Sequence, residues 1–293
     1  MHLTLAIMTA LCLLGCDARQ GPLLTNLAAP DAGAVAQHDT LDAGHTAARD
    51  SGADVAHAPP LRAAVRADMS LQYQITGTLD TKVDADLFVT DLFDTSAAQV
   101  STLHAAGRVV IAYVSVGTLE HWRDDASSFP RAAVGQTLVG YPDESWLDIR
   151  DGDVRAAMRA RFELALSKGF DGVYASSLGV YRAASGFPLT QADELDYADT
   201  LADAAHARGL SIGMSGDFEL AAQLAPSFDW ALDFGCVAAM TCAELSPLKA
   251  AGMPVFDLEI ETDHASDCMS AASAGVAVTL KHRGYDAYRS TCP

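Results

Sequence analysis

Residues 190–214 read TQADELDYADTLADAAHARGLSIGM, and this stretch decides the fold class. Its first part predicts a helix. Thr190 is suited to the N-cap, Asp193 stands three residues later, and Gly209 suits the C-cap, where the backbone often turns left-handed. The apolar run Leu210–Met214 follows at once and predicts a short buried strand. A helix that leads directly into a strand is the repeating unit of an α/β protein.

The same alternation recurs from Leu71 to the end of the chain. A second helix is predicted over Val154–Ser167, where Val154, Met158 and Phe162 recur at the spacing of one helix face. Eight short apolar or β-branched runs are predicted strands: Leu71–Ile75, Leu87–Thr90, Val109–Val114, Gly172–Tyr174, Leu210–Met214, Trp230–Asp233, Val255–Glu259 and Val276–Leu280.

Eight strands that alternate with helices over about 225 residues predict a single (β/α)8 TIM barrel. The alternative within the α/β class is a doubly wound open sheet. Such a sheet usually carries a glycine-rich phosphate loop after its first strand, and Gln74–Gly77, which reads QITG, is not one. The sequence therefore favours the barrel.

The amino-terminal run Leu3–Leu14 is apolar but too short to span a bilayer core, which needs about 20 residues. It is typical of a secretory signal, and it ends in Leu-Leu-Gly-Cys, which resembles a bacterial lipobox. The resemblance implies cleavage before Cys16 and acylation of that cysteine, with residues 1–15 as the lipoprotein signal peptide. An ordinary signal peptide or a misassigned start codon is the alternative, because no Lys or Arg precedes the run. We therefore expect a lipid-anchored protein of the cell envelope, exported across the inner membrane.

Residues 16–66 are predicted to be a disordered linker that joins the anchor to a folded domain over residues 67–293. From Asp17 to Arg66 the chain is rich in Ala, Asp, Gly, Thr and Pro and lacks aromatic residues. So little apolar surface cannot offset the conformational entropy lost on folding.

Charge excludes one class of partner. The chain has 38 acidic and 19 basic side chains, a formal net charge of −19. Binding to nucleic acid requires a positive face that neutralises phosphates. The four lysines are scattered singly along the chain, so no nucleic-acid partner is expected.

Removal of the signal peptide and acylation of Cys16 would leave four cysteines, Cys236, Cys242, Cys268 and Cys292. An even number in an exported domain favours disulfides. Of the three possible pairings, the local one is predicted, with Cys236 bonded to Cys242 and Cys268 to Cys292. A zinc site is the alternative, but no CxxC or nearby histidine pair supports it, so neither a metal nor another cofactor is expected.

Several blocks of sequence carry a resemblance to a known family. They include Asp91–Ser96 (DLFDTS), Tyr113–Arg123 (YVSVGTLEHWR), Glu144–Arg150 (ESWLDIR) and Lys168–Val173 (KGFDGV). In this order, within a match that extends from Leu71 to Cys292, they resemble the endo-α-1,4-polygalactosaminidase-like family of glycoside hydrolases. The resemblance implies a (β/α)8 barrel, secreted or surface-attached, that acts on α-1,4-linked galactosamine polymers without a metal.

The sequence departs from the family pattern where catalysis is concerned. The family tends to show Glu-Pro-Asp-Asn where this chain has YASS over residues 174–177, and Asn-Glu-Gln where it has DFG over residues 233–235. Glycoside hydrolysis normally uses two carboxyl groups. Ser176 and Phe234 stand at the usual acidic positions, and neither can protonate a leaving oxygen near neutral pH. Whether the protein is an enzyme is therefore open.

In a (β/α)8 barrel the chemistry lies on the loops that follow the carboxyl ends of the strands. Asp91 and Glu259 stand at such ends and are predicted to face each other across the mouth as catalytic residues, with Asp217 as the third candidate. The structural alternative for each is a helix cap or an ion pair. Glu120 and Arg123, three residues apart, can likewise pair with each other. The predicted substrate-binding residues are Tyr113, Ser115, Glu120, Trp122, Arg123, Tyr174, Ser176, Tyr181 and Lys281.

Two functional hypotheses follow. The first is a glycoside hydrolase-like surface lipoprotein that acts on an amino-sugar polysaccharide with a shifted carboxylate pair. The second is a non-catalytic pseudo-hydrolase that binds glycan or serves an envelope role. Both expect a monomer that meets the membrane only through its lipid anchor. An active enzyme should place two carboxylates within about 10 Å of each other in an open cleft.

Overall fold

The computed structural model describes residues 65–216, 218–260, 268–269 and 275–292. The predicted signal peptide, Cys16, almost all of the predicted linker and Asp217 lie outside these residues. Within the described part, no helix has the length and apolar character needed to cross a membrane.

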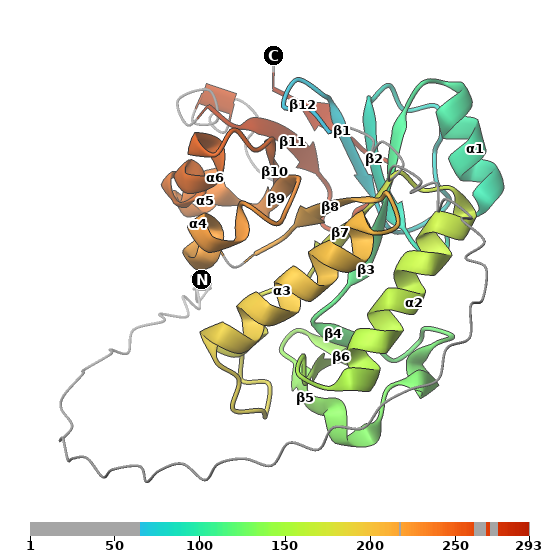
Figure 1. Ribbon diagram of the computed structural model, residues 1–293. Coiled ribbons are helices and arrows are strands. Elements are labelled where there is room, and N and C mark those ends of the chain that lie inside the picture. The colour runs from blue at the N-terminus through green and yellow to red at the C-terminus, as the bar shows by residue number, and fades with distance from the viewer. Residues whose placement is uncertain (1–64, 217, 261–267, 270–274, 293) are drawn as a thin grey trace, which may run out of the picture. The chain divides into compact units, whose positions relative to one another are not determined.

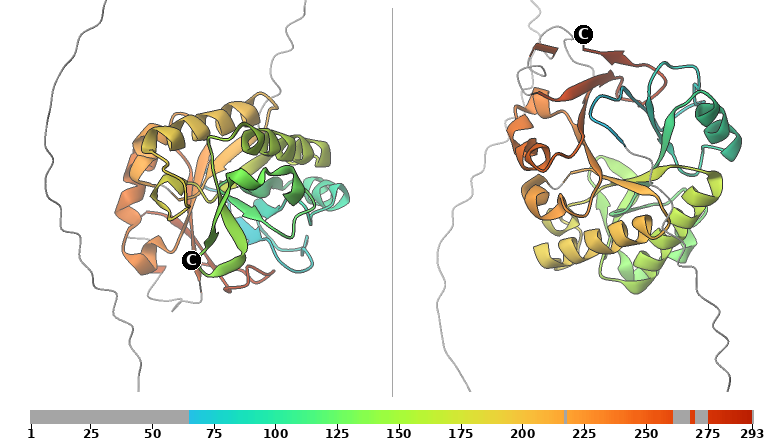
Figure 2. Two further views of the ribbon diagram at one scale, coloured as in Figure 1. Left: turned by 90° about the horizontal axis from the view of Figure 1, so that it is seen from below. Right: turned by 45° about the horizontal axis from the view of Figure 1, so that its top comes forward.

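Eight parallel strands, adjacent in chain order, form the main sheet in the described part of the chain. The sheet curls with helices on its outer side, as the right panel of Figure 2 shows. This arrangement confirms the predicted TIM-barrel class over the open doubly wound sheet. The strands are β1 (Leu71–Gln74), β2 (Leu87–Asp91), β3 (Val109–Ser115), β7 (Gly172–Ser176), β8 (Ser211–Met214), β9 (Trp230–Phe234), β10 (Val255–Ile260) and β11 (Ala277–Lys281).

Side chains connect the two ends of this sheet. No backbone ladder joins β1 to β11 in the described residues, and β12 (Ser290–Thr291) pairs antiparallel with β11 instead. Arg289 donates from Nε to the Leu71 carbonyl at 2.7 Å, and Lys281 donates from Nζ to Gln72 Oε1 at 3.2 Å. The barrel is therefore closed at this seam by side-chain hydrogen bonds.

The helices begin at sequence-encoded caps. Thr190 and Asp193 form the predicted capping box of α3, and Ser96 forms another with Gln99 at α1. Asp151 accepts from two amides at the start of α2. The helices are α1 (Ala97–Ala105), α2 (Gly152–Lys168), α3 (Gln191–His206), α4 (Ala221–Leu224), α5 (Cys236–Ala239) and α6 (Ser246–Ala250), with 3-10 turns η1 (Ala126–Ser128), η2 (Arg131–Ala133), η3 (Val180–Arg182), η4 (Phe218–Leu220) and η5 (Cys242–Leu245).

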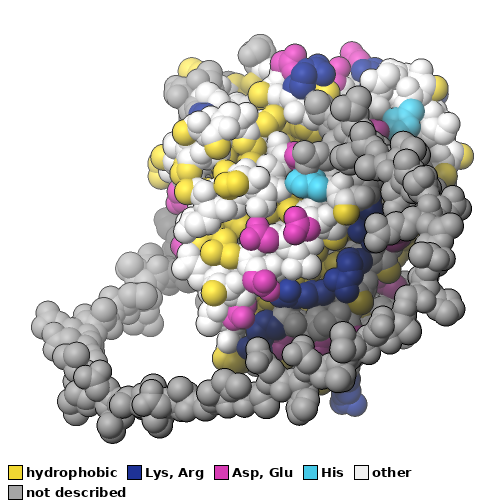
Figure 3. All heavy atoms as spheres, viewed as in Figure 1, with side chains coloured by type: hydrophobic (Ala, Val, Ile, Leu, Met, Phe, Trp, Pro, Cys, Tyr) yellow, Lys and Arg dark blue, Asp and Glu magenta, His cyan; other side chains and the backbone are white. Residues whose placement is uncertain are grey.

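Two ion pairs join α2 and α3. Arg155 lies 2.7 Å from Asp196, and Arg208, just beyond α3, lies 2.8 Å from Glu163. Figure 3 shows carboxylates and basic side chains interspersed on this face. Such partly exposed pairs add little to stability, about 0–1 kcal/mol each.

The chain inserts a small antiparallel sheet between β3 and α2, an element absent from the predicted strands. It consists of β4 (Thr118–Glu120), β5 (Val134–Leu138) and β6 (Tyr141–Leu147), in the order β4-β6-β5. Their sequences, TLE, VGQTL and YPDESWL, mix polar and apolar residues, so they lack the apolar runs that mark the barrel strands. The insertion lies at the carboxyl ends of the barrel strands, at the bottom of Figure 1.

The core has two layers. One cluster fills the space between the strands and the helices, and a second fills the barrel interior. A Cβ at Gly213 would lie 2.2 Å from the Trp230 indole, so only glycine lets this large ring into the barrel. The interior cluster contains Leu71, Tyr73, Leu87, Val89, Ile111, Tyr174, Trp230, Leu232, Phe256 and Leu258.

Both predicted disulfides are present. Cys236 is bonded to Cys242, which closes the loop after β9, and Cys268 is bonded to Cys292 near the carboxyl terminus. The local pairing is therefore confirmed over the two other pairings and over a zinc site built from these cysteines.

Candidate active site

Aromatic rings lie at the carboxyl-end mouth of the barrel. Tyr73 of β1 lies at the centre, with ring-centroid distances of 6.4 Å to Tyr113, 6.1 Å to Tyr174, 5.5 Å to Phe234 and 5.4 Å to Tyr285. These edge-on contacts are favourable for aromatic pairs. They make a rigid aromatic floor under any ligand at the mouth.

The two tyrosines predicted to bind substrate have different positions in this floor. Tyr174 is fully buried, which argues against a direct contact with a sugar. Tyr113 is partly exposed and is hydrogen-bonded to Ser176. Burial raises the pKa of Tyr113, so its phenol stays protonated and remains able to donate. The structure therefore leaves Tyr113, and not Tyr174, available to a ligand.

Arg123 holds two buried carboxylates beside the mouth. Its guanidinium donates to both oxygens of Glu120 at 2.9 and 2.8 Å and to both oxygens of Asp91 at 3.0 and 2.5 Å. All three side chains are at most 6 % exposed. The predicted Glu120–Arg123 pair is present, but Asp91, predicted as catalytic, is also held in an ion pair.

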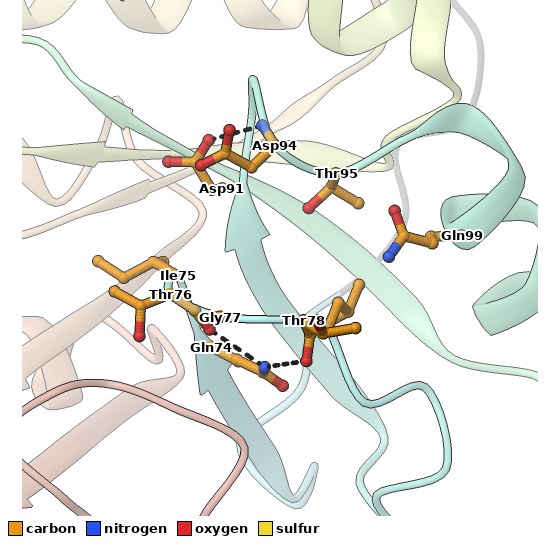
Figure 4. Close-up of a pocket in the computed structure, with 10 residues that line it drawn as sticks. Gln74, Ile75, Thr76, Gly77, Thr78, Asp91, Asp94, Thr95 and Gln99 are labelled. Carbon is orange, nitrogen blue, oxygen red and sulfur yellow. Dashed lines mark hydrogen bonds between the residues drawn. The ribbon is translucent and has the colours of Figure 1, made fainter. Parts of the chain in front are cut away.

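Asp91 has a second structural role. Its Oδ1 accepts from the amides of Phe93 and Asp94 at 2.8 and 2.9 Å, so it fixes the turn after β2. The alternative that Asp91 caps the following helix is wrong, because Ser96 occupies that position. Asp91 and Asp94 line one wall of a polar cavity of about 290 Å³, opposite Gln74 and Thr78 (Figure 4).

A third carboxylate, Glu144, belongs to the same group of side chains. Glu144 on β6 lies directly opposite Glu120 on β4, and its Oε2 accepts from the Thr118 hydroxyl at 2.8 Å. Burial and the charge of Glu120 raise the pKa of Glu144, while the Thr118 hydrogen bond and Arg123 oppose the shift. Glu144 therefore keeps its proton to a higher pH than an ordinary glutamate, whereas Arg123 pairs with Glu120.

Sequence reasoning did not select Glu144 as a site residue. It appeared only inside the ESWLDIR block, and its partner strand was not predicted. The sequence held one signal for it: Glu120 and Glu144 belong to two of the blocks that carry the family resemblance. Predicting the β4–β6 pairing would have placed the two glutamates side by side.

Glu259 lies elsewhere. Its Oε1 accepts from the amides of Val237 and Ala238 at 2.7 and 3.2 Å, and its side chain is buried against α5. The predicted arrangement, in which Asp91 and Glu259 face each other across an open mouth, is therefore not the one observed. Asp217 lies outside the described residues, and its predicted role stays a prediction.

The other residues predicted to bind substrate differ in their exposure and in their contacts. Trp122 is 55 % exposed and lies over the Arg123 guanidinium, 5.4 Å from ring centroid to Cζ. Ser115 is buried and hydrogen-bonded to Thr118. Tyr181 donates to Glu219 at 3.4 Å.

Lys281 is 1 % exposed and donates to Gln72 and to the carbonyls of Asp286 and Tyr288. These contacts assign it to the barrel seam, which argues against a contact with substrate.

The sequence matches the glycoside-hydrolase family GH114 over residues 52–293. Among solved structures, Ega3 from Aspergillus fumigatus, in complex with galactosamine, is 30% identical with a TM-score of 0.74, over 80% of this chain and all of that one. The glycoside hydrolase domain of PelA from Pseudomonas aeruginosa is 15% identical with a TM-score of 0.62, over 76% of this chain and 98% of that one. A search of curated protein sequences found no match.

Proposed function

The chain belongs to glycoside-hydrolase family GH114, and on that premise we propose that its barrel mouth binds and cleaves an α-1,4-linked amino-sugar polysaccharide. The observation that carries the proposal is the group Asp91, Glu120, Glu144 and Arg123. Asp91 and Glu120 share one guanidinium there, and Glu144 lies directly opposite Glu120, beside an aromatic floor. A cationic sugar amine complements that excess of acid.

The galactosamine in the Ega3 complex supports this substrate class. A galactosamine polymer carries protonated amines near neutral pH, and exposed Asp94, 3.8 Å from Arg123, adds another carboxylate at the edge of the cavity. Trp122 and Tyr113 offer ring faces for stacking. Recognition would thus combine stacking with pairing of the amine to a carboxylate.

The shifted carboxyl pair would be Glu144 and Glu120. Hydrolysis requires one carboxylic acid and one carboxylate, and enzymes obtain them by giving the two groups different surroundings. Arg123 donates two hydrogen bonds to Glu120, while burial and the neighbouring charge of Glu120 favour the protonated form of Glu144. Glu144 would therefore be the general acid, and Glu120 the second carboxyl group of the pair.

Glu144→Gln is expected to lower the rate of cleavage of an α-1,4-galactosamine oligomer by about 10²–10⁴-fold, the usual contribution of a general acid. Glutamine preserves the shape and the Thr118 hydrogen bond, so affinity for the oligomer should change little. Product analysis by mass spectrometry gives the rate, and calorimetry gives the affinity.

Asp143→Asn is the matched control, because Asp143 is the exposed neighbour on β6. It should cleave as the wild type does. A Glu144→Gln variant that cleaves at the wild-type rate would remove Glu144 from the mechanism.

A second candidate function is glycan binding without cleavage. Phe234 supports it, because its ring packs on Tyr73 and Tyr285 at the position where the resemblance places a glutamate. Ser176 likewise stands where an aspartate is usual. Wild-type protein that binds the oligomer and releases no product would favour this function over hydrolysis.

We propose in addition that Cys16 carries a lipid anchor. Cys16→Ser is expected to move the protein from the membrane fraction to the soluble fraction of cells that express the full chain, because the acylated cysteine is lost. Cys12→Ser, inside the apolar run, is the control and should leave the protein membrane-bound. Equal membrane association of both variants would overturn the anchor.

A further inference from the structure

Two buried carboxyl groups lie outside the proposed site, on the outer face of β10. Asp257 and Glu259 are 0 % and 1 % exposed. Asp257 Oδ1 accepts from the amides of Gly235 and Cys236 at 3.1 and 3.3 Å, and Glu259 Oε1 accepts from the next two amides of the chain. Together they bind the backbone of Gly235, which joins β9 to α5, and of the first three residues of α5, a segment (residues 235–238) termed the β9–α5 loop.

Each of these carboxyl groups has a second oxygen that binds no backbone amide of this loop. Neither Asp257 Oδ2 nor Glu259 Oε2 meets a hydrogen-bond donor among the described residues. The two side chains point the same way from one strand and are within hydrogen-bond reach of each other. Two ionised carboxylates in this position would repel each other and leave two buried acceptors unsatisfied, which is costly. One proton between them removes both penalties.

Within the part of the chain that the structure describes, the strands and the helix that pack against the pair do not supply the missing positive charge. On β9, the half-buried Asp233 adds a further carboxylate, which is within hydrogen-bond reach of Asp257 and adds to the negative charge beside Glu259. On α5 the described side chains carry no ionisable group, because Cys236 is in a disulfide. On β11, Lys281 directs its ammonium to the barrel seam.

A metal ion does not fit the ligands that the described residues offer here. The sulfur of Cys236 lies close to the carboxylates of Asp233 and Asp257, but it is bonded to Cys242 and is not a thiolate. A hard cation such as Ca²⁺ takes six to eight oxygen ligands. Asp257 Oδ1 and Glu259 Oε1 already accept backbone amides, so too few oxygens remain.

We propose that Asp257 and Glu259 share a single proton, and that this proton clamps the β9–α5 loop which holds Phe234 at the barrel mouth. Phe234 precedes the four clamped amides directly, and its ring contacts Tyr73 and Tyr285. Loss of the proton would place two repelling charges under the loop and loosen it. The loop would remain closed by the Cys236–Cys242 disulfide.

The direction of the pH effect follows from the pKa. Burial and the neighbouring Glu259 raise the pKa of Asp257 to about 8. In the unfolded chain this carboxyl ionises near pH 4. The shared proton therefore stabilises the folded state fully below about pH 4, and its contribution falls as the pH rises towards 8.

Asp257→Asn tests the shared proton. The asparagine carbonyl can keep both backbone bonds, and its NH2 group can donate to Glu259 in place of the proton. At pH 5 the variant should have a melting temperature close to that of the wild type. When the pH is raised from 5 to 8.5, the melting temperature of the wild type should fall by at least about 4 °C more than that of the variant. A difference of this size corresponds to a pKa shift of one unit or more. Asp203→Asn, on exposed α3 surface, is the matched control and should follow the wild type.

Hydrogen exchange gives a second readout that does not depend on global unfolding. Over the same pH range, amides 235–238 should lose protection in the wild type and keep it in Asp257→Asn, after correction for the intrinsic exchange rate. The proposal would be overturned if the melting temperatures of the wild type and Asp257→Asn changed equally with pH and the wild type kept the protection of amides 235–238. A rise in wild-type melting temperature with CaCl2, absent in Asp257→Asn, would also overturn it, in favour of a cation site.

Discussion

Arg123→Met is expected to lower the free energy of unfolding by about 3–5 kcal/mol, the usual cost of removing one partner of a buried ion pair. Arg123 donates to both oxygens of Asp91 and of Glu120, and all three side chains are almost fully buried. Without the guanidinium, two buried carboxylates would lie close together without a counter-charge. The β4–β6 insertion would also lose its link to the turn after β2.

Urea denaturation of the disulfide-intact domain measures this change. Arg159→Met is the matched control, since Arg159 is exposed on α2, and it should change the free energy of unfolding by less than about 0.5 kcal/mol. The loss of unfolding free energy in Arg123→Lys should be smaller than in Arg123→Met and larger than in Arg159→Met, because lysine keeps the charge but not the bidentate geometry. A loss below 1 kcal/mol in Arg123→Met would show that the network adds little to stability.

Restoring the family's acids is expected to have the largest effect on activity. Ser176→Asp combined with Phe234→Glu should raise the rate of cleavage of an α-1,4-galactosamine oligomer by at least about 100-fold over the wild type. A positioned acid or base typically contributes 10²–10⁴-fold. Both positions are strand ends at the mouth, and Ser176 is hydrogen-bonded to Tyr113, so the new carboxyl groups would lie beside the proposed ligand.

Ser176→Asn combined with Phe234→Gln is the control for shape. It matches the size of the restored acids but cannot transfer a proton, so it should cleave no faster than the wild type. Equal rates for the acid and amide pairs would mean that the mouth no longer positions a glycosidic bond. That result would support the non-cleaving glycan-binding function.

The barrel could be predicted in detail because its signals are local. All eight predicted strands are present, with boundaries that differ by one or two residues. Short apolar runs, the Thr190 capping box and Gly209 each depend on residues within a few positions of one another. The small sheet β4–β6 was not predicted, since its strands mix polar and apolar residues and contain no continuous apolar run.

The candidate site was predicted only in part, because its groups meet across distant segments. The Glu120–Arg123 pair is three residues apart and could be predicted. The contact of Arg123 with Asp91 spans 32 positions and could not. Position at a strand end also does not fix side-chain direction, and for that reason Glu259 was assigned to the mouth although it lies beneath α5.

The sequence by itself determined the α/β barrel, the disulfide pairing, the family resemblance and the loss of two acids at Ser176 and Phe234. These follow from local patterns and from residue identity. Only the tertiary structure decided which carboxyl groups stand together: Asp91 and Glu120 on Arg123, Glu144 beside them, and Asp257 with Glu259 away from the mouth. The reason is physical, since the ionisation of a carboxyl group depends on its burial and on charges within a few ångströms, and folding alone sets both.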